Sequence, residues 1–264
     1  MTKKILYYIY ITISLVFVIS STTYLVKIFS SYKKINNKSL FLLNNEKKYL
    51  IIEYKEDIYQ TKDSNGNIVT ESRRNIPIIK SIENQKQADK IVNYLTKKSN
   101  ERWKDIKKSA DEYTKLNNNQ KVGVNYILGN VAQSEYYSSF IFRLNGHMGG
   151  LDCSDIKAYT FNNKTGKVLK LSDITSNNKK LKKYLSDEII NYISKQEYVD
   201  KLDKNWKKKI GDTIAKTGNW YINEDGLNII IPKYSIGPGI VDIIEYRFDY
   251  KYINSFLLKK YKKM

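Results

Sequence analysis

The sequence predicts an α+β protein in which a transmembrane helix precedes a mostly antiparallel sheet with helices packed on one face. Three observations predict this class. An uncharged run, Ile5–Val26, has the length of a membrane-spanning helix. Alternating apolar segments come in pairs around turn residues, as in antiparallel hairpins. Helical segments interrupt these pairs without the regular βαβ alternation of a parallel sheet.

The uncharged run is predicted to anchor the chain in a membrane. Its 22 residues reach roughly 33 Å as a helix, against a hydrocarbon core of roughly 30 Å. A cleaved secretory signal is the alternative, because Lys3 and Lys4 form a basic start and Ser20 and Ser21 are small. The run exceeds the roughly 7 to 15 apolar residues of such signals and lacks an A-x-A-like site, so the anchor is favoured. Residues 1–34 are therefore assigned to a short cytoplasmic end and a single-pass transmembrane helix.

Residues 45–145 are predicted to form a first α+β domain. The turn Ser64–Asn67 contains Asn-Gly between two alternating segments, which predicts a hairpin. Asn84, with Gln87 three residues on, predicts the cap of a helix that runs to about Leu116. The apolar stripe of this helix consists of Ala88, Ile91, Val92, Leu95, Trp103, Ile106, Ala110 and Tyr113. The two half-buried strands that follow are marked by Val122, Val124, Tyr126 and Leu128 and by Phe140, Phe142 and Leu144.

Residues 146–258 are predicted to form a second α+β domain. The two parts make one unit or two sub-domains, joined near residues 117–121 or 146–150. A glycine-rich loop over residues 145–155 precedes two strands around the turn Asn163–Gly166.

The rest of this second part is predicted to hold two helices and a return to strands. The helical stripes are Leu181, Leu185, Ile189 and Tyr192, then Tyr198, Leu202, Trp206 and Ile210. Asp225–Gly226 predicts a hairpin turn. The link after it contains Pro232, Pro238 and Gly239. Residues 243–253 then alternate between apolar and polar side chains, which predicts a further strand.

The charge of the chain predicts anionic partners. The formal net charge is +19, and residues 1–34 hold five lysines and no acid, which leaves +14 for the rest. Such a surface attracts nucleic acid, acidic lipid headgroups or wall polyphosphates. The alternative is compositional, because Lys, Asn, Ile and Tyr are abundant together in proteins of AT-rich genomes. In that case the lysines form a solvated face, with tight clusters at residues 204–209 and 259–264.

The sequence predicts no catalytic, cofactor-binding or metal-ligating residues. Cys153 and His147 are the single cysteine and histidine, so neither an internal disulfide nor a usual zinc site can form. A Cys/His catalytic pair lacks any residue that orients it, and a histidine in a glycine-rich turn is the commoner case. Glu224 and Asp225 are neighbours in a turn rather than carboxylates opposed across a cleft. Nucleotide-binding and nucleophile-elbow motifs are absent, so the protein is not expected to be an enzyme.

Two stretches of the chain together resemble a known family. Thr165-Gly166-Lys167 precedes a Leu-x-Leu-x-Asp segment, and an aromatic strand later enters the Asp225–Gly226 turn. A tail with Pro232, Tyr234, Ile236, Pro238 and Gly239 follows. This order resembles the C-terminal domain of unknown function found in the anti-sigma factor RsiV and the deacetylase PdaC. The segment at residues 76–81 and the long helix look like the companion N-terminal domain, so the resemblance covers roughly residues 45–258.

The resemblance implies an extracytoplasmic, membrane-tethered α+β module of a Gram-positive cell envelope. Only Met1–Lys4 stand before the uncharged run in this sequence, so we do not expect it to hold a sigma factor as the anti-sigma relative does. The sequence shows no deacetylase domain after the module, so deacetylase activity is not expected. Where the family has a Gly-Gly-Ala-His loop, this chain has Gly149-Gly150-Leu151-Asp152. We therefore expect a non-catalytic ligand-binding or sensing module; the alternative is a peptidoglycan-acting enzyme or an accessory to one.

The partner is expected to be an anionic cell-wall polymer or an envelope protein. In the anti-sigma relative the module binds lysozyme, which is typically basic and would be repelled by a domain of charge +14. A lysozyme-like partner would need an acidic patch, to which Asp152, Asp155 and Asp173 are the candidate contributors. Nucleic acid is not expected as a partner, because it requires a cytosolic domain.

Overall fold

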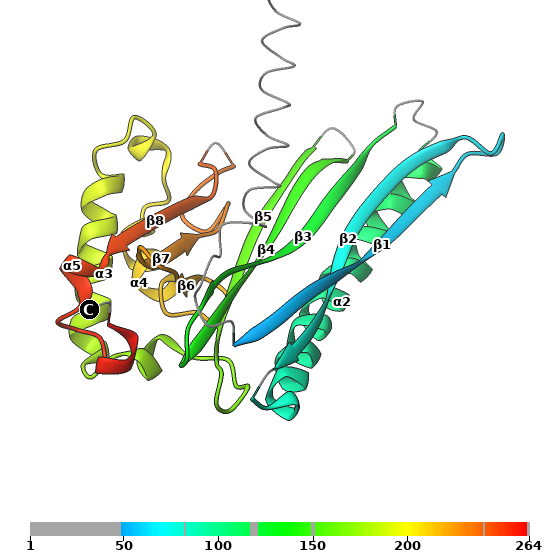
Figure 1. Cartoon of the computed structure of the whole chain (residues 1–264). Coiled ribbons are helices and arrows are strands. Elements are labelled where there is room, and N and C mark those ends of the chain that lie inside the picture. Colours follow the sequence, from blue (N-terminus) through cyan, green and yellow to red (C-terminus); the bar gives the residue numbers. More distant parts are fainter. Residues whose placement is uncertain (1–48, 82, 117–120, 149–150, 240, 263–264) are drawn as a thin grey trace, which may run out of the picture. The chain divides into compact units, whose positions relative to one another are not determined.

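The computed structural model describes residues 49–81, 83–116, 121–148, 151–239 and 241–262, with the elements labelled in Figure 1. Lys48–Met264 is one compact unit. Among the described helices, none has the length and hydropathy needed to cross a membrane. The predicted anchor lies outside the described residues.

The larger of two sheets has five strands in the spatial order β1-β2-β3-β4-β5. They are β1 (Leu50–Lys62), β2 (Ile68–Ser81), β3 (Gly123–Gln133), β4 (Tyr137–Met148) and β5 (Leu151–Asn162). Neighbours are antiparallel except β2 and β3, which pair in parallel. The α+β class and the first hairpin are confirmed, but the sheet is mixed. A helix between β2 and β3 returns the chain, so the two strands run in the same direction.

That helix, α2 (Gln85–Lys115), lies along one face of the larger sheet (Figure 1). Its predicted cap is confirmed, because the side-chain oxygen of Asn84 accepts a hydrogen bond from the N–H of Gln87 at 3.4 Å. The predicted stripe is buried, except that Val92 is only partly buried. The core under α2 includes Ile91, Leu95 and Trp103 from the helix and Val124, Leu128, Phe140 and Phe142 from the sheet.

The loop predicted at residues 145–155 is wrong, because β4 and β5 continue through this region as a hairpin. Gly146 of β4 pairs with Cys153 of β5. A Cβ on Gly146 would lie 2.4 Å from the carbonyl oxygen of Gly123, so glycine lets β3 and β4 approach there. The predicted boundary between the two α+β parts falls inside β4.

The segment after β5 forms a turn and a 3₁₀ helix instead of the predicted second strand. Gly166 takes the left-handed conformation expected at the turn, with φ of +66°. Val168 then makes an isolated bridge to β5. The chain winds into η1 (Leu171–Ile174), where the carboxylate of Asp173 accepts the N–H of Lys170 at 2.8 Å. This local side-chain bond replaces the ladder bonds that a strand would make.

Two helices follow, and the second is shorter than predicted. α3 (Asn178–Ile193) buries Leu181, Leu185, Ile189 and Ile193, whereas Tyr192 of the predicted stripe is 42% exposed. Tyr198 and Leu202 do not belong to a helix with Trp206; they flank η2 (Val199–Lys201), and α4 spans Trp206–Thr213. The N–H of Asp203 bonds the carbonyl oxygen of Ile236 at 3.0 Å, a long-range contact that interrupts the helical pattern.

The smaller sheet is antiparallel and consists of β6 (Trp220–Ile222), β7 (Gly226–Ile231) and β8 (Ile244–Asp249). The turn at Asp225–Gly226 is confirmed. The strand predicted to reach residue 253 ends early, because α5 (Tyr250–Ile253) follows β8. Tyr250 directs its hydroxyl to the carbonyl oxygen of Asn223 at 3.0 Å, which turns the chain toward the hairpin. The last described helical turn is η3 (Lys259–Tyr261).

A small apolar cluster joins the two sheets. Ile141 of β4 and Ala158 of β5 pack with Tyr221 and Ile230 of the smaller sheet. β4 is therefore buried on both faces along its first half, and its predicted half-buried character is wrong there. The opposite face of the smaller sheet packs against α3 and α4 in a separate core that includes Leu185, Ile210, Trp220 and Ile229.

Candidate binding site

His147 and Cys153 lie near each other in the β4–β5 hairpin but do not form a catalytic pair. Cys153 pairs with Gly146, the residue before His147, so the two positions fall on opposite faces of the sheet. Cys153 packs against the core under α2, whereas His147 lines a hollow on the other face. A nucleophile and its base would need to share one face.

The hollow beside His147 has a volume of about 490 Å³ and is also lined by Glu71, Arg73 and Lys121. The hydrogen bond from Arg73 is the main cause that lowers the pKa of Glu71 to about 2, with Gln60 and Lys121 contributing. Glu71 lies 2.8 Å from the Arg73 guanidinium and 3.5 Å from the Lys121 ammonium. Because the carboxylate pairs with both cations, this hollow does not present a concentrated charge.

Two of the residues expected in an acidic patch, Asp155 and Asp173, lie far apart. The backbone of Asp152 pairs with His147, and Asp155 pairs with Leu144, both near the start of β5. Asp173 lies in η1, beyond the other end of β5, roughly 20 Å along the strand. Its carboxylate is engaged with the backbone of Lys170.

Asp225, one of the two adjacent acidic residues in the β6–β7 turn, has a structural role. Asp225 lies 3.4 Å from the guanidinium of Arg247 on β8, and its N–H bonds the side chain of Asn223. This is the turn chemistry that the sequence indicates for Glu224 and Asp225. The described residues contain no group of three His, Cys, Asp or Glu side chains suited to a metal ion.

The link after β7 contains a feature that sequence reasoning missed. Tyr234 has a φ of +64° and is the one non-glycine residue with a positive φ in the described part of the chain. Its side chain is 65% exposed. A left-handed conformation costs a non-glycine residue roughly 1 to 2 kcal/mol. Such strain persists only where the surroundings impose it, and it is concentrated at binding and active sites.

The surroundings of Tyr234 impose this conformation. Ile236 anchors the link, because it is 1% exposed and belongs to the core under α3. The N–H of Ser235 bonds the carbonyl oxygen of Pro232 at 3.1 Å, which closes a tight turn. The ring of Tyr234 lies over Gly239, where an added Cβ would be 2.5 Å from the ring carbon Cε1. The link therefore presents an aromatic ring on a fixed backbone.

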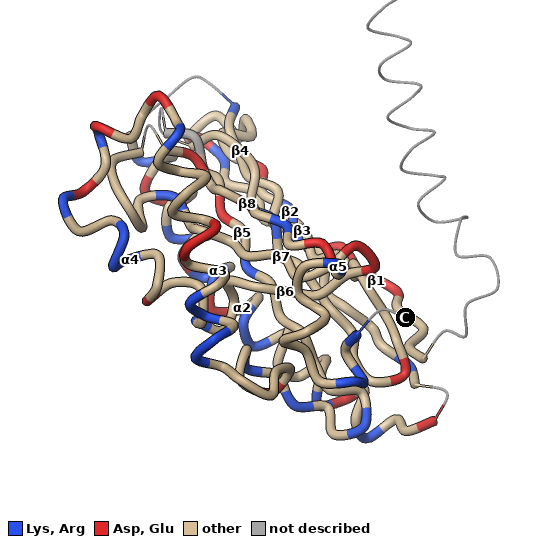
Figure 2. The backbone as a smooth tube through the Cα atoms, turned by 90° about the vertical axis from the view of Figure 1, so that its left-hand side faces the viewer, with Lys and Arg blue, Asp and Glu red and all other residues tan. Residues whose placement is uncertain are grey.

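One basic residue, Lys233, lies beside this ring. The Lys233 ammonium lies 5.7 Å from the centre of the Tyr234 ring. The carbonyl of Ile236 bonds the backbone of Asp203, which joins the link to the segment that carries the lysine cluster 204–209. Figure 2 shows basic residues beside α4. An exposed aromatic ring offers contact area to a partner, and the Lys233 ammonium beside it offers a positive charge to an anionic one.

The comparisons with known proteins support the predicted resemblance. Residues 172–251 match the family described as protein of unknown function (DUF3298). This region is therefore a DUF3298 region, the RsiV/PdaC-like C-terminal domain that the motifs indicate. No curated protein matches the chain.

Solved structures of two DUF3298 family members are similar to this chain. One, from Bacteroides fragilis NCTC 9343, is 16% identical, covers 80% of this chain and 94% of its own, and has a TM-score of 0.53. Another, from Pseudomonas aeruginosa PAO1, is 13% identical, covers 83% of this chain and 98% of its own, and has a TM-score of 0.48. The first similarity extends the shared fold beyond the matched family region.

Proposed function

We propose that this chain is a non-catalytic ligand-binding or sensing module of the bacterial cell envelope, anchored in the membrane with its folded part outside the cytoplasm. The observation that carries the binding role is Tyr234, a strained and exposed tyrosine on a clamped link. The anchor is supported by the uncharged run Ile5–Val26. The extracytoplasmic placement is supported by the resemblance of residues 45–258.

An anionic cell-wall polymer is the proposed partner. Residues 35–264 carry a net charge of +14. Lys233 lies beside the Tyr234 ring, and a backbone bond from Asp203 to Ile236 joins the link to the segment that precedes the 204–209 cluster. A basic lysozyme-like protein would need an acidic patch, and two expected contributors, Asp155 on β5 and Asp173 in η1, lie far apart. Attraction between the exposed lysines and a polymer is screened by salt, because the Debye length contracts from about 10 Å at 0.1 M to about 3 Å at 1 M.

Replacing Tyr234 by alanine is expected to weaken polymer binding by about tenfold or more, as at an aromatic hot spot. Full-length protein in non-ionic detergent is titrated with teichoic acid at low and high salt. Tyr252→Ala is the matched control, because Tyr252 is also well exposed, at 57%, but lies in α5. Tyr234→Gly removes the ring and relieves the strain, so it should lose binding without losing stability.

Two results would contradict this proposal. Equal polymer affinities for Tyr234→Ala and Tyr252→Ala would remove the binding role of Tyr234. Tight, salt-insensitive binding of lysozyme would show that a local complementary surface outweighs net charge, and the partner would then be a protein.

Protease added to intact, wall-stripped cells is expected to digest the folded part, because the anchor would hold it outside the cytoplasmic membrane. A cytoplasmic protein of the same cells serves as the protected control. Recovery of a soluble chain in the medium, trimmed at its N-terminus, would instead identify residues 5–26 as a cleaved signal.

A further inference from the structure

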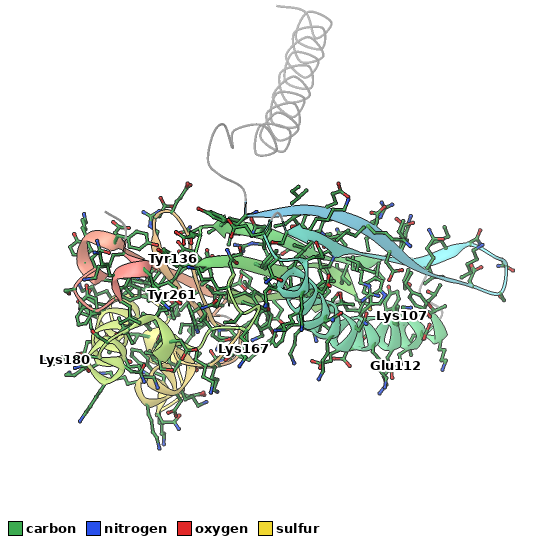
Figure 3. All side chains as sticks on the ribbon, turned by 60° about the horizontal axis from the view of Figure 1, so that its bottom comes forward. Lys107, Glu112, Tyr136, Lys167, Lys180 and Tyr261 are labelled. Carbon is green, nitrogen blue, oxygen red and sulfur yellow. The ribbon has the colours of Figure 1, made fainter. Side chains whose placement is uncertain are left out.

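A hollow of about 380 Å³ lies between the turn after β5 and the end of the described chain. Its walls come from distant parts of the sequence, since Lys167 and Lys170 follow β5 and Lys260 belongs to η3. Lys167 and Tyr261, a wall residue from η3, are labelled in Figure 3. Residues 259–264 form a basic cluster in the sequence, and the fold places Lys260 of this cluster at the same hollow as two further lysines.

We infer that this hollow is a second anion site, which binds a phosphate group of the wall polymer through Lys167, Lys170 and Lys260. The identity of the polymer rests on the proposed function. The binding of a phosphate group rests on the geometry of the hollow alone. The hollow is separate from the Tyr234 link, whose residues do not line it.

The three lysines have no carboxylate partner among the described residues. All three are exposed, and none lies within 4.0 Å of an acidic oxygen. Seven lysines elsewhere do have such a partner: Lys98, Lys108, Lys121, Lys164, Lys183, Lys209 and Lys251. Three lysines without a carboxylate partner therefore line one hollow, with the Lys260 ammonium 5.0 Å from the centre of the Tyr261 ring, and this positive charge favours an anion.

The acidic residue that lines the hollow, Asp173, already accepts a hydrogen bond from the backbone. Asp173 lines the hollow, but its carboxylate accepts the backbone N–H of Lys170 at 2.8 Å. Tyr261 adds no negative charge, because burial raises the pKa of its hydroxyl and the Asp173 carboxylate raises it further, although Asn162 acts in the opposite direction. The charge in the hollow is therefore positive near neutral pH.

The backbone that carries the lysines is held in place. Gly166 fits against α2, where an added Cβ would lie 2.6 Å from the carbonyl oxygen of Gln87. On the other side, Tyr261 is 1% exposed and the N–H of Leu258 bonds the carbonyl oxygen of Ile174 at 2.9 Å. Only the lysine side chains need to adjust when an anion enters.

A phosphate group suits this hollow in particular. Its oxygens can accept hydrogen bonds from several ammonium groups at once, and lysine binds phosphate as a point charge. Thr165 adds a hydroxyl to the wall, and Val168, Leu169 and the Tyr261 ring add apolar surface. That surface can contact the carbon chain between successive phosphates of a polyol-phosphate polymer.

The test compares two triple variants that remove the same charge. Lys167→Gln, Lys170→Gln and Lys260→Gln together neutralise the hollow. Lys179→Gln, Lys180→Gln and Lys195→Gln together neutralise three exposed lysines that also lack an ion pair and do not line the hollow. Full-length protein in non-ionic detergent is titrated with inorganic phosphate and, separately, with teichoic acid, and amide shifts are followed by NMR.

Inorganic phosphate is expected to shift the amides of residues 165–170 and η3, and the hollow variant should bind it about tenfold more weakly than the control variant. Equal phosphate affinity of the two variants, or shifts elsewhere only, would overturn the site. Tyr234→Ala should bind phosphate as the native protein does, which supports two separate sites. Phosphate binding at the hollow without any teichoic acid binding would overturn the polymer as partner and leave the anion site standing.

Discussion

Replacing Gly226 by valine is expected to destabilise the folded part by about 2 to 4 kcal/mol, through backbone strain and steric overlap. Gly226 begins β7 with a φ of +158°. A Cβ there would lie 2.0 Å from the carbonyl oxygen of Phe248 and 3.1 Å from Cα of Asp249. These atoms belong to the backbone of β8, which pairs with β7 at this point, so the strand cannot move away without losing its ladder.

Gly66→Val is the matched control for Gly226→Val. Gly66 also has a positive φ, +83°, but an added Cβ there would meet no atom within 4 Å. Its replacement therefore measures backbone strain alone, about 1 to 2 kcal/mol. Urea denaturation compares the two variants. If Gly226→Val lowers the free energy of unfolding by no more than Gly66→Val does, β7 and β8 do not approach each other closely at Gly226.

Arg74→Ala is expected to cost about 2 to 4 kcal/mol of unfolding free energy, because it leaves a cavity under α2 and removes the partner of the partly buried Asp57 carboxylate and of the buried Ser99 hydroxyl. Arg74 is 8% exposed and joins the larger sheet to α2. Its guanidinium lies 2.7 Å from the Asp57 carboxylate, donates to Asn100 at 2.7 Å and lies 5.0 Å from the centre of the Trp103 ring. Arg74→Lys should recover only part of the loss, since an ammonium lacks the planar fork.

The neighbouring Arg73 provides the control on the opposite face of the same strand. Its side chain is 45% exposed, and it pairs with Glu56 and Glu71 at the surface. Exposed ion pairs contribute about 1 kcal/mol or less, so Arg73→Ala should change the urea midpoint little. Equal losses for Arg73→Ala and Arg74→Ala would contradict the buried network beneath α2.

Local patterns predicted several elements well. Asn65-Gly66 between alternating segments indicated the first hairpin, and Asn84 with the apolar stripe indicated α2 over nearly its full length. The Asp225–Gly226 turn and the body of α3 were predicted in the same way. These features depend on residues close in sequence, whose turn chemistry, capping and periodicity act before any tertiary contact forms. The motifs also indicated the DUF3298 resemblance, now matched over residues 172–251.

Errors arose where distant segments meet. Gly146 looked like a loop residue, but it lets β4 run on beside Gly123, which lies earlier in the chain. Residues 198–202 carried helical spacing, but the following residue, Asp203, bonds the link after β7, and the helix starts later. Ile141 was expected on a half-buried strand, and the smaller sheet covers it.

The same distinction between local and long-range information applies to the candidate binding residues. By itself the sequence determined the charge, the uncharged run, the turns and the position of Tyr234 within a proline-bounded motif, because these are properties of residues and their neighbours. Only the tertiary structure decided that Tyr234 is strained and exposed, that Cys153 and His147 lie on opposite faces of the sheet, and that Lys260 lines the same hollow as Lys167 and Lys170. The reason is that backbone conformation, burial and the pairing of charges depend on contacts between segments far apart in the chain, which local periodicity does not encode.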